Sequence, residues 1–201
     1  MKRQVQWLMA VILSLGLAGL ANPMNGAEPG ILAGKVVVTR GKKDQNTVVY
    51  LKGIQGDYKP PQEIAALDQV NKVFLPHLLP VLKGQTVRFN NRDPVVHNIH
   101  LHWEGRSMRN QSQAPHTHDD WVALRTGKYL VLCNIHTEMS AVVFVFDHPF
   151  FAVANPEFAI KDIPPGSYSL VAVRDVSGNI REQEKQVTIK GGETTEVRIQ
   201  Y

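Results

Sequence analysis

The sequence is poor in sulfur-containing side chains. Its 201 residues include one cysteine, Cys133, and five methionines. A single thiol cannot form an intramolecular disulfide, which excludes a small disulfide-stabilised scaffold. In an exported chain, a free thiol is open to oxidation and cross-linking unless another group occupies the sulfur. The surroundings of Cys133 therefore need an explanation.

Long apolar runs are also scarce, and the single candidate lies at the N-terminus. Two basic residues precede an apolar stretch from Trp7 to Leu20, and small residues follow. This order predicts a bacterial-type signal peptide over residues 1–27, cleaved after Ala21 or Ala27, and hence a periplasmic or secreted protein. The run is short for a membrane span and no second run follows, so we expect a mature protein that does not span the membrane. A permanent N-terminal anchor is the alternative.

Clusters of one charge are missing. Removal of the predicted leader lowers the 22 basic residues to 20 against 18 acidic ones, so the net charge falls from +4 to +2. No basic run is longer than Lys42 and Lys43, and no strip combines basic with aromatic residues. We therefore expect no nucleic-acid partner.

No long stretch shows helical periodicity. Short apolar or alternating runs bounded by Gly, Pro and Asn predict an all-β protein. The polar segment from Gly105 to His118 contains Pro115 and is expected to form a long loop. The predicted strands are Lys35 to Val38, Thr47 to Leu51, Val70 to Leu75, Leu78 to Val81, Thr86 to Asn90, Asn98 to Trp103, Asp120 to Leu124, Lys128 to Cys133, Ala141 to Phe146, Glu157 to Ile160, Ser167 to Arg174, Lys185 to Ile189 and Thr194 to Gln200.

The segment CNIHTEM has the spacing of metal ligands. Cys133, His136 and Met139 lie three residues apart, so one tight turn after a strand can direct all three side chains at one point. A thiolate, an imidazole and a thioether suit a soft or borderline metal, and copper above others. His97, in NNRDPVVHNIH, offers a second imidazole. Two histidines and a cysteine with a distant methionine form a blue-copper site, in which copper would hold the cysteine as thiolate. Alone, the same spacing could also arise from ordinary core residues.

The residues around this motif carry a family resemblance. FLPHLLPVLKGQTVRFNNRDPVVHN and TGKYLVLC, together with CNIHTEM, resemble the cupredoxins, the family of plastocyanin, amicyanin and pseudoazurin, over about Glu63 to Asp147. The ligand spacing looks most like that of amicyanin. The matching residues are Phe74, Pro76, Gly84, Val87, Phe89, Asn90, Asp93, His97, Asn98, Gly127, Tyr129, Cys133, His136 and Met139.

The resemblance implies a Greek-key sandwich that binds one type 1 copper ion. The implied ligands are His97, Cys133, His136 and Met139. It also implies that Asn98 braces the ligand loop through a hydrogen bond. Such a protein passes single electrons between redox partner proteins, with His136 and Ile135 as the route to the surface. It binds no small-molecule substrate, and we expect no enzyme.

Other functions remain open at this point. One is a periplasmic copper-binding module for delivery or sensing, without a role in electron transfer. Another is an interaction protein with a vestigial site. The run HNIHLHW also resembles a segment of the multicopper oxidases, but those enzymes flank their cysteine with histidines. Here Leu132 and Asn134 flank Cys133, so we expect no trinuclear oxidase site.

Four further histidines form a candidate second metal site. Period two places His100 and His102 on one face of a strand, opposite two apolar residues. His116 and His118 lie in the polar segment that follows. The four side chains could bind copper or zinc, or they could be ordinary solvated histidines.

The flanking residues exceed what one cupredoxin needs. GKVVVTRGKKDQNTVVYLKG resembles the beginning of a carboxypeptidase regulatory-like sandwich, and EFAIKDIPPGSYSLVAVRD with KQVTIKGGETTEVRIQY resembles its end. We interpret residues 28–58 and 148–201 as one discontinuous β-sandwich, with the copper domain over 63–147 inserted into it. In the alternative, the N-terminal strands extend the copper sandwich. A sandwich of this type suggests partner docking or scaffolding.

Overall fold

The computed structural model describes residues 27–39, 47–176 and 179–201, and every regular element in these ranges is a β-strand. The all-β prediction is confirmed. No helix in the described ranges is long and apolar enough to cross a membrane. The predicted signal peptide lies, except for Ala27, outside the described residues.

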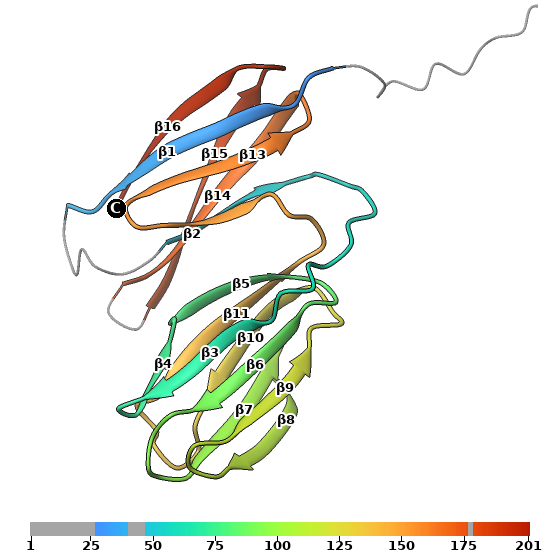
Figure 1. Ribbon diagram of the computed structural model, residues 1–201. Helices are drawn as coiled ribbons and strands as arrows, with labels where there is room; N and C mark the ends of the chain where they lie inside the picture. Colours follow the sequence, from blue (N-terminus) through green and yellow to red (C-terminus); the bar gives the residue numbers. More distant parts are fainter. Residues whose placement is uncertain (1–26, 40–46, 177–178) are drawn as a thin grey trace, which may run out of the picture.

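The described strands form four sheets, arranged in two groups (Figure 1). Strands β3–β11 form the first group, here called the central sandwich, with sheet orders β5-β11-β10-β7-β8 and β4-β3-β6-β9. Its strands are β3 (Ala65–Val70), β4 (Val73–Leu75), β5 (Leu78–Leu82), β6 (Thr86–Asn91), β7 (His97–Trp103), β8 (Arg106–Gln113), β9 (His118–Val122), β10 (Gly127–Leu132) and β11 (Ser140–Phe146).

The second group, here called the terminal sandwich, combines both ends of the described chain. Its sheet orders are β13-β1-β16 and β12-β2-β14-β15. The strands are β1 (Gly30–Val37), β2 (Thr47–Lys52), β12 (Phe151–Ala154), β13 (Glu157–Ile163), β14 (Gly166–Val176), β15 (Asn179–Ile189) and β16 (Thr194–Gln200). Strands β1 and β2 therefore pair with C-terminal strands. This pairing supports our proposal that residues 28–58 and 148–201 form one discontinuous domain around 63–147.

Strand β11 explains why the two sandwiches are attached. Its residues alternate between two apolar clusters, since Val143 faces the core of the central sandwich while Val142 and Phe144 face outward. The outward pair packs with Val48 of β2 and Val171 of β14. Both faces of the strand are thus covered, which accounts for its continuous apolar sequence.

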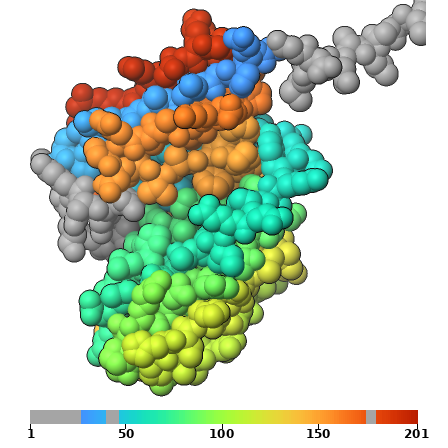
Figure 2. Space-filling view, in the orientation of Figure 1, coloured from blue at the N-terminus to red at the C-terminus, as the bar shows by residue number. Residues whose placement is uncertain are grey.

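The attachment leaves one end of the central sandwich uncovered. β11 runs from Ser140 to Phe146, beyond which the chain enters the terminal sandwich. On the face shown in Figure 2, atoms of the terminal sandwich gather at one end of the molecule, and the other end belongs to the central sandwich. The β6–β7 and β10–β11 connections lie at this uncovered end (Figure 1).

The strand prediction was wrong in several places, and it also omitted β12 and most of β3. Residues 106–113 form β8 within the segment predicted as a loop, and β8 pairs antiparallel with β7. This strand lies at a sheet edge and is largely exposed, so it lacks the apolar alternation that reveals a strand. The strand predicted over 70–75 is interrupted by a tight turn at Asn71 and Lys72, whose φ values are 53° and 59°.

Candidate metal centre

The ends of two neighbouring strands bring the candidate ligands together. His97 is the first residue of β7, and Cys133 directly follows β10. These strands pair antiparallel, with Leu132 opposite His100, so the start of β7 lies beside the end of β10. His136 and Met139 belong to the short connection to β11.

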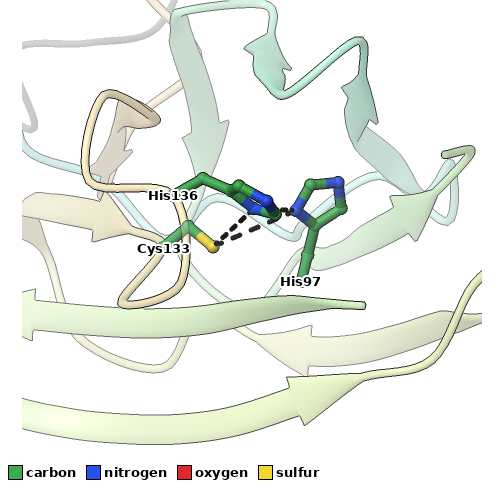
Figure 3. Close-up of side chains that lie close together, drawn as sticks. All are labelled: His97, Cys133 and His136. Carbon is green, nitrogen blue, oxygen red and sulfur yellow. Dashed lines mark hydrogen bonds between the residues drawn. The ribbon is translucent and has the colours of Figure 1, made fainter. Parts of the chain in front are cut away.

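The thiol and the two imidazoles face one another (Figure 3). Cys133 Sγ lies 4.0 Å from His97 Nδ1 and 3.8 Å from His136 Nδ1, and the two Nδ1 atoms are 3.1 Å apart. Within the described ranges, this is the one group of three or more His, Cys, Asp or Glu residues whose ligand atoms converge in this way. The structure thus brings together three of the four predicted ligands.

The triangle formed by these three atoms has the size of a metal site. The three distances place the point equidistant from the atoms about 2.1 Å from each, which is a normal length for a metal–nitrogen bond and slightly short for metal–sulfur. His97 and Cys133 are buried, with 0% and 2% of their surface exposed, and His136 is half-buried. The donor set and its spacing therefore fit copper.

Met139 lies at the base of the same loop. Its backbone N–H donates to His136 O at 3.0 Å, and its carbonyl accepts from Cys133 N at 3.4 Å. The Met139 side chain is buried in the apolar cluster that also contains Cys133. Its thioether as a fourth ligand remains a prediction.

A buried carboxylate holds the far side of the His97 ring. Asp93 Oδ2 accepts a hydrogen bond from His97 Nε2 at 2.7 Å and another from Lys72 N at 2.9 Å, while Oδ1 accepts from Asn71 N at 2.6 Å. Because Nε2 carries the proton, the Nδ1 lone pair is free to face Cys133. The turn at Asn71 and Lys72 thus presents two amides to the carboxylate that orients a candidate ligand.

The electrostatics of Asp93 agree with an ionised carboxylate. Burial alone would raise its pKa, but the hydrogen bonds from Lys72 N, His97 and Asn71 N outweigh this and hold the pKa below its ordinary value. Asp93 is one of the residues that resemble the cupredoxins, but the sequence alone predicted no role for it. Its position four residues before His97 was the available signal.

Asn98 makes the contact that the resemblance implied. Its Oδ1 accepts a hydrogen bond from Asn134 N at 3.3 Å, and its Nδ2 donates to Asn110 Oδ1 at 2.8 Å. The ligand loop is therefore connected to β7 and, through Asn110, to β8. That this contact braces a metal site stays a prediction.

The structure does not gather the other four histidines into one site. His100 and His102 lie on the outer face of β7 as predicted, with ring centroids 3.9 Å apart. Both nitrogens of His100 already have hydrogen-bond partners. His116 and His118 are exposed, and no second convergent group is found within the described ranges.

Exposed apolar side chains accompany the candidate ligands. Ile135, next to His136, is 52% exposed, and Val95 and Val96, just before His97, are 37% and 45% exposed. These residues belong to the two connections at the uncovered end of the central sandwich. The candidate metal centre therefore lies beside a surface on which a protein could dock.

The known proteins that resemble this chain match only part of it. No protein-family model and no curated protein matches the chain. A purple cupredoxin from Nitrosopumilus maritimus is 22% identical, with a TM-score of 0.38, over 41% of this chain and 99% of that one. A reduced amicyanin mutant is 17% identical, with a TM-score of 0.39, over 49% of this chain and 98% of that one. An oxidised amicyanin mutant is 21% identical, with a TM-score of 0.38, over 41% and 81%. These scores are low, so any functional conclusion depends on the site.

Proposed function

We propose that this protein is a cupredoxin-type electron carrier that holds one type 1 copper ion in its central sandwich. The residues that would hold the ion are His97, Cys133 and His136, whose ligand atoms converge, together with Met139 as the proposed fourth ligand. The observation that carries the proposal is the convergence of one buried thiol and two imidazole Nδ1 atoms within 4.0 Å of one another. Bound copper would supply a one-electron redox couple.

The residues of this chain have separate tasks in the proposal. Cys133 would hold the ion as a thiolate, since a bound metal ion favours the deprotonated thiol. Asp93 fixes the ring of His97, and the strand ends keep the ligands in place when the oxidation state changes. His136 is less buried than His97 and lies next to exposed Ile135, so it gives the electron a route to the surface.

The arrangement of the sandwiches supports redox partner proteins as the binding partners. The terminal sandwich attaches through β11 and leaves the metal end of the central sandwich free. A partner can therefore reach the apolar surface at Val95, Val96 and Ile135. The leader predicted over residues 1–27 supports a periplasmic or secreted location. In this role the protein would accept and donate single electrons without converting a substrate, so it would be a carrier and not an enzyme.

A copper titration followed by reduction tests this function against copper delivery or sensing. Purified protein is loaded with Cu(II), its visible spectrum is recorded, and a mild reductant and then an oxidant are added. Electron transfer predicts an intense blue or purple band that disappears and returns while copper stays bound. Copper released on reduction would favour delivery. A loaded protein without such a band would contradict a type 1 site.

A further inference from the structure

The residue that follows the candidate thiolate ligand is fixed from outside the ligand loop. Asn134 replaces the histidine that an oxidase would carry at this place, and it is exposed. Its backbone amide donates to Asn98 Oδ1. Its side-chain oxygen lies 2.9 Å from Nδ1 of His100. Two residues of β7 thus hold Asn134, one through its backbone and one through its side chain.

The hydrogen bonds of His100 define a single direction of donation. A carboxamide oxygen only accepts, so His100 Nδ1 donates to Asn134 Oδ1. His100 Nε2 lies 2.9 Å from Ser107 Oγ on β8, and this hydroxyl can serve as its hydrogen-bond partner. The His102 ring packs against His100, which limits rotation of the ring. The imidazole is therefore held on both nitrogens and on one face.

The rest of the loop is closed mainly by its own backbone. Cys133 N donates to Met139 O, and Met139 N donates to His136 O. These two bonds shape the loop but do not connect it to β7 or β8. Besides the approach of His136 to His97, the contacts of Asn134 with Asn98 and His100 connect the loop to β7, and they do so one residue away from the sulfur.

We propose that His100 is a positioning residue that, through Asn134, keeps the ligand loop in its metal-binding shape before the ion arrives. The role of this brace in electron transfer rests on the function proposed above, whereas its effect on the loop does not. A loop held in advance loses less freedom on binding the metal and moves less between oxidation states. The histidine that looked like part of a second metal site is thus assigned to the first one.

Two substitutions of His100 separate the two ring nitrogens. In His100→Asn, the side-chain amide occupies the place of Nδ1 and can still donate to Asn134. In His100→Gln, the amide occupies the place of Nε2 and loses that contact. Both variants lose the ring that packs against His102, so packing effects are matched. His102→Gln is the control, because His102 lies beside His100 while its buried Nε2 makes no hydrogen bond among the described residues.

The first measurement uses the metal-free protein and amide hydrogen exchange. We expect the Asn134 amide to exchange roughly two- to tenfold faster in His100→Gln, which is the size of one lost hydrogen bond. His100→Asn and His102→Gln should stay close to wild type at this amide. The Val143 amide in the core reports whether a variant is globally destabilised. Equal Asn134 exchange in all four proteins, with Val143 unchanged, would overturn the proposal.

The second measurement uses Cu(II)-loaded protein and records the reduction potential and the copper EPR spectrum. His100→Gln should shift both away from wild type, and His100→Asn should restore them. The exchange measurement and the copper measurement can fail independently, because hydrogen exchange needs no copper. A wild-type protein without a type 1 spectrum would contradict the electron carrier and leave the brace supported. Faster Asn134 exchange with an unchanged potential and EPR spectrum would overturn the link from His100 to the metal.

Discussion

Asp93 Oδ2 accepts a hydrogen bond from His97 Nε2 at 2.7 Å, and both side chains are buried. The carboxylate is itself held by the amides of Asn71 and Lys72. A negative charge on the far side of an imidazole increases the electron density at the ligating nitrogen. The turn between β3 and β4 thus acts on the proposed metal ion through Asp93 and His97.

Asp93→Asn should weaken metal binding and raise the reduction potential. The neutral amide gives less electron density to His97. Its NH2 group would also face a backbone N–H of residue 71 or 72, which places two hydrogen-bond donors against each other. We expect a loss of about 10- to 100-fold in Cu(II) affinity, measured by competition with a chelator, and a higher potential in redox titration. Asp68→Asn removes an equal charge that pairs with Arg92 and does not contact His97. Equal effects of the two substitutions would contradict a specific role for Asp93.

Met139→Leu should retain the colour and change the potential. The side chain is buried, and leucine fills a similar volume, so the cost in unfolding free energy should remain below about 1.5 kcal/mol. Loss of the thioether removes the proposed fourth ligand and should shift the potential in cyclic voltammetry. An unchanged potential would count against Met139 as a ligand.

Phe144→Ala should destabilise the protein without changing the metal site. Phe144 is buried between the two sandwiches and points away from the core that contains Cys133. Removal of such a ring costs about 3–5 kcal/mol in unfolding free energy, measured by urea denaturation. Leu130→Ala is the control, since Leu130 lies on the neighbouring strand and is 40% exposed. Equal losses of unfolding free energy in the two variants would contradict a stabilising role for Phe144 between the two sandwiches.

Tyr201→Phe should remove part of the alkaline sensitivity of the terminal sandwich. Burial of the Tyr201 ring raises its pKa from 10.0 to about 12, and its hydroxyl donates to Ala172 O at 2.7 Å. The folded state favours the neutral phenol, so its stabilisation is complete below pH 10.0 and is lost as the pH rises towards 12. Between these values, the unfolding free energy should fall less steeply in the variant. Equal slopes would contradict the burial of a neutral phenol.

The candidate ligands could be predicted because three of them lie within one short loop. Residues 133, 136 and 139 need only a tight turn to converge, and His97 adds a strand start beside it. The role of Asp93 could not be predicted, because it depends on a turn 21 and 22 residues away that presents two amides. β8 was missed because a polar strand at a sheet edge has no apolar alternation.

The contact between the sandwiches depends on tertiary structure in the same way. The sequence predicted a strand over Ala141 to Phe146, but it does not show that Val142 and Phe144 meet β2 and β14. The pairing of β1 with β16 joins residues at opposite ends of the described chain. Local periodicity predicts most of the strands, and the resemblance of the two flanking segments predicted that they form one domain, whereas the register between β1 and β16 is given only by the structure.

The visible spectrum of the Cu(II)-loaded wild type, recorded beside that of Cys133→Ser, tests the proposed copper site directly. A type 1 site predicts an intense thiolate-to-copper band in the wild type that a mild reductant bleaches and an oxidant restores. The serine variant should bind Cu(II) without that band. A wild type that shows no band, or a Cys133→Ser protein that keeps one, would contradict the assignment of Cys133 as the thiolate ligand.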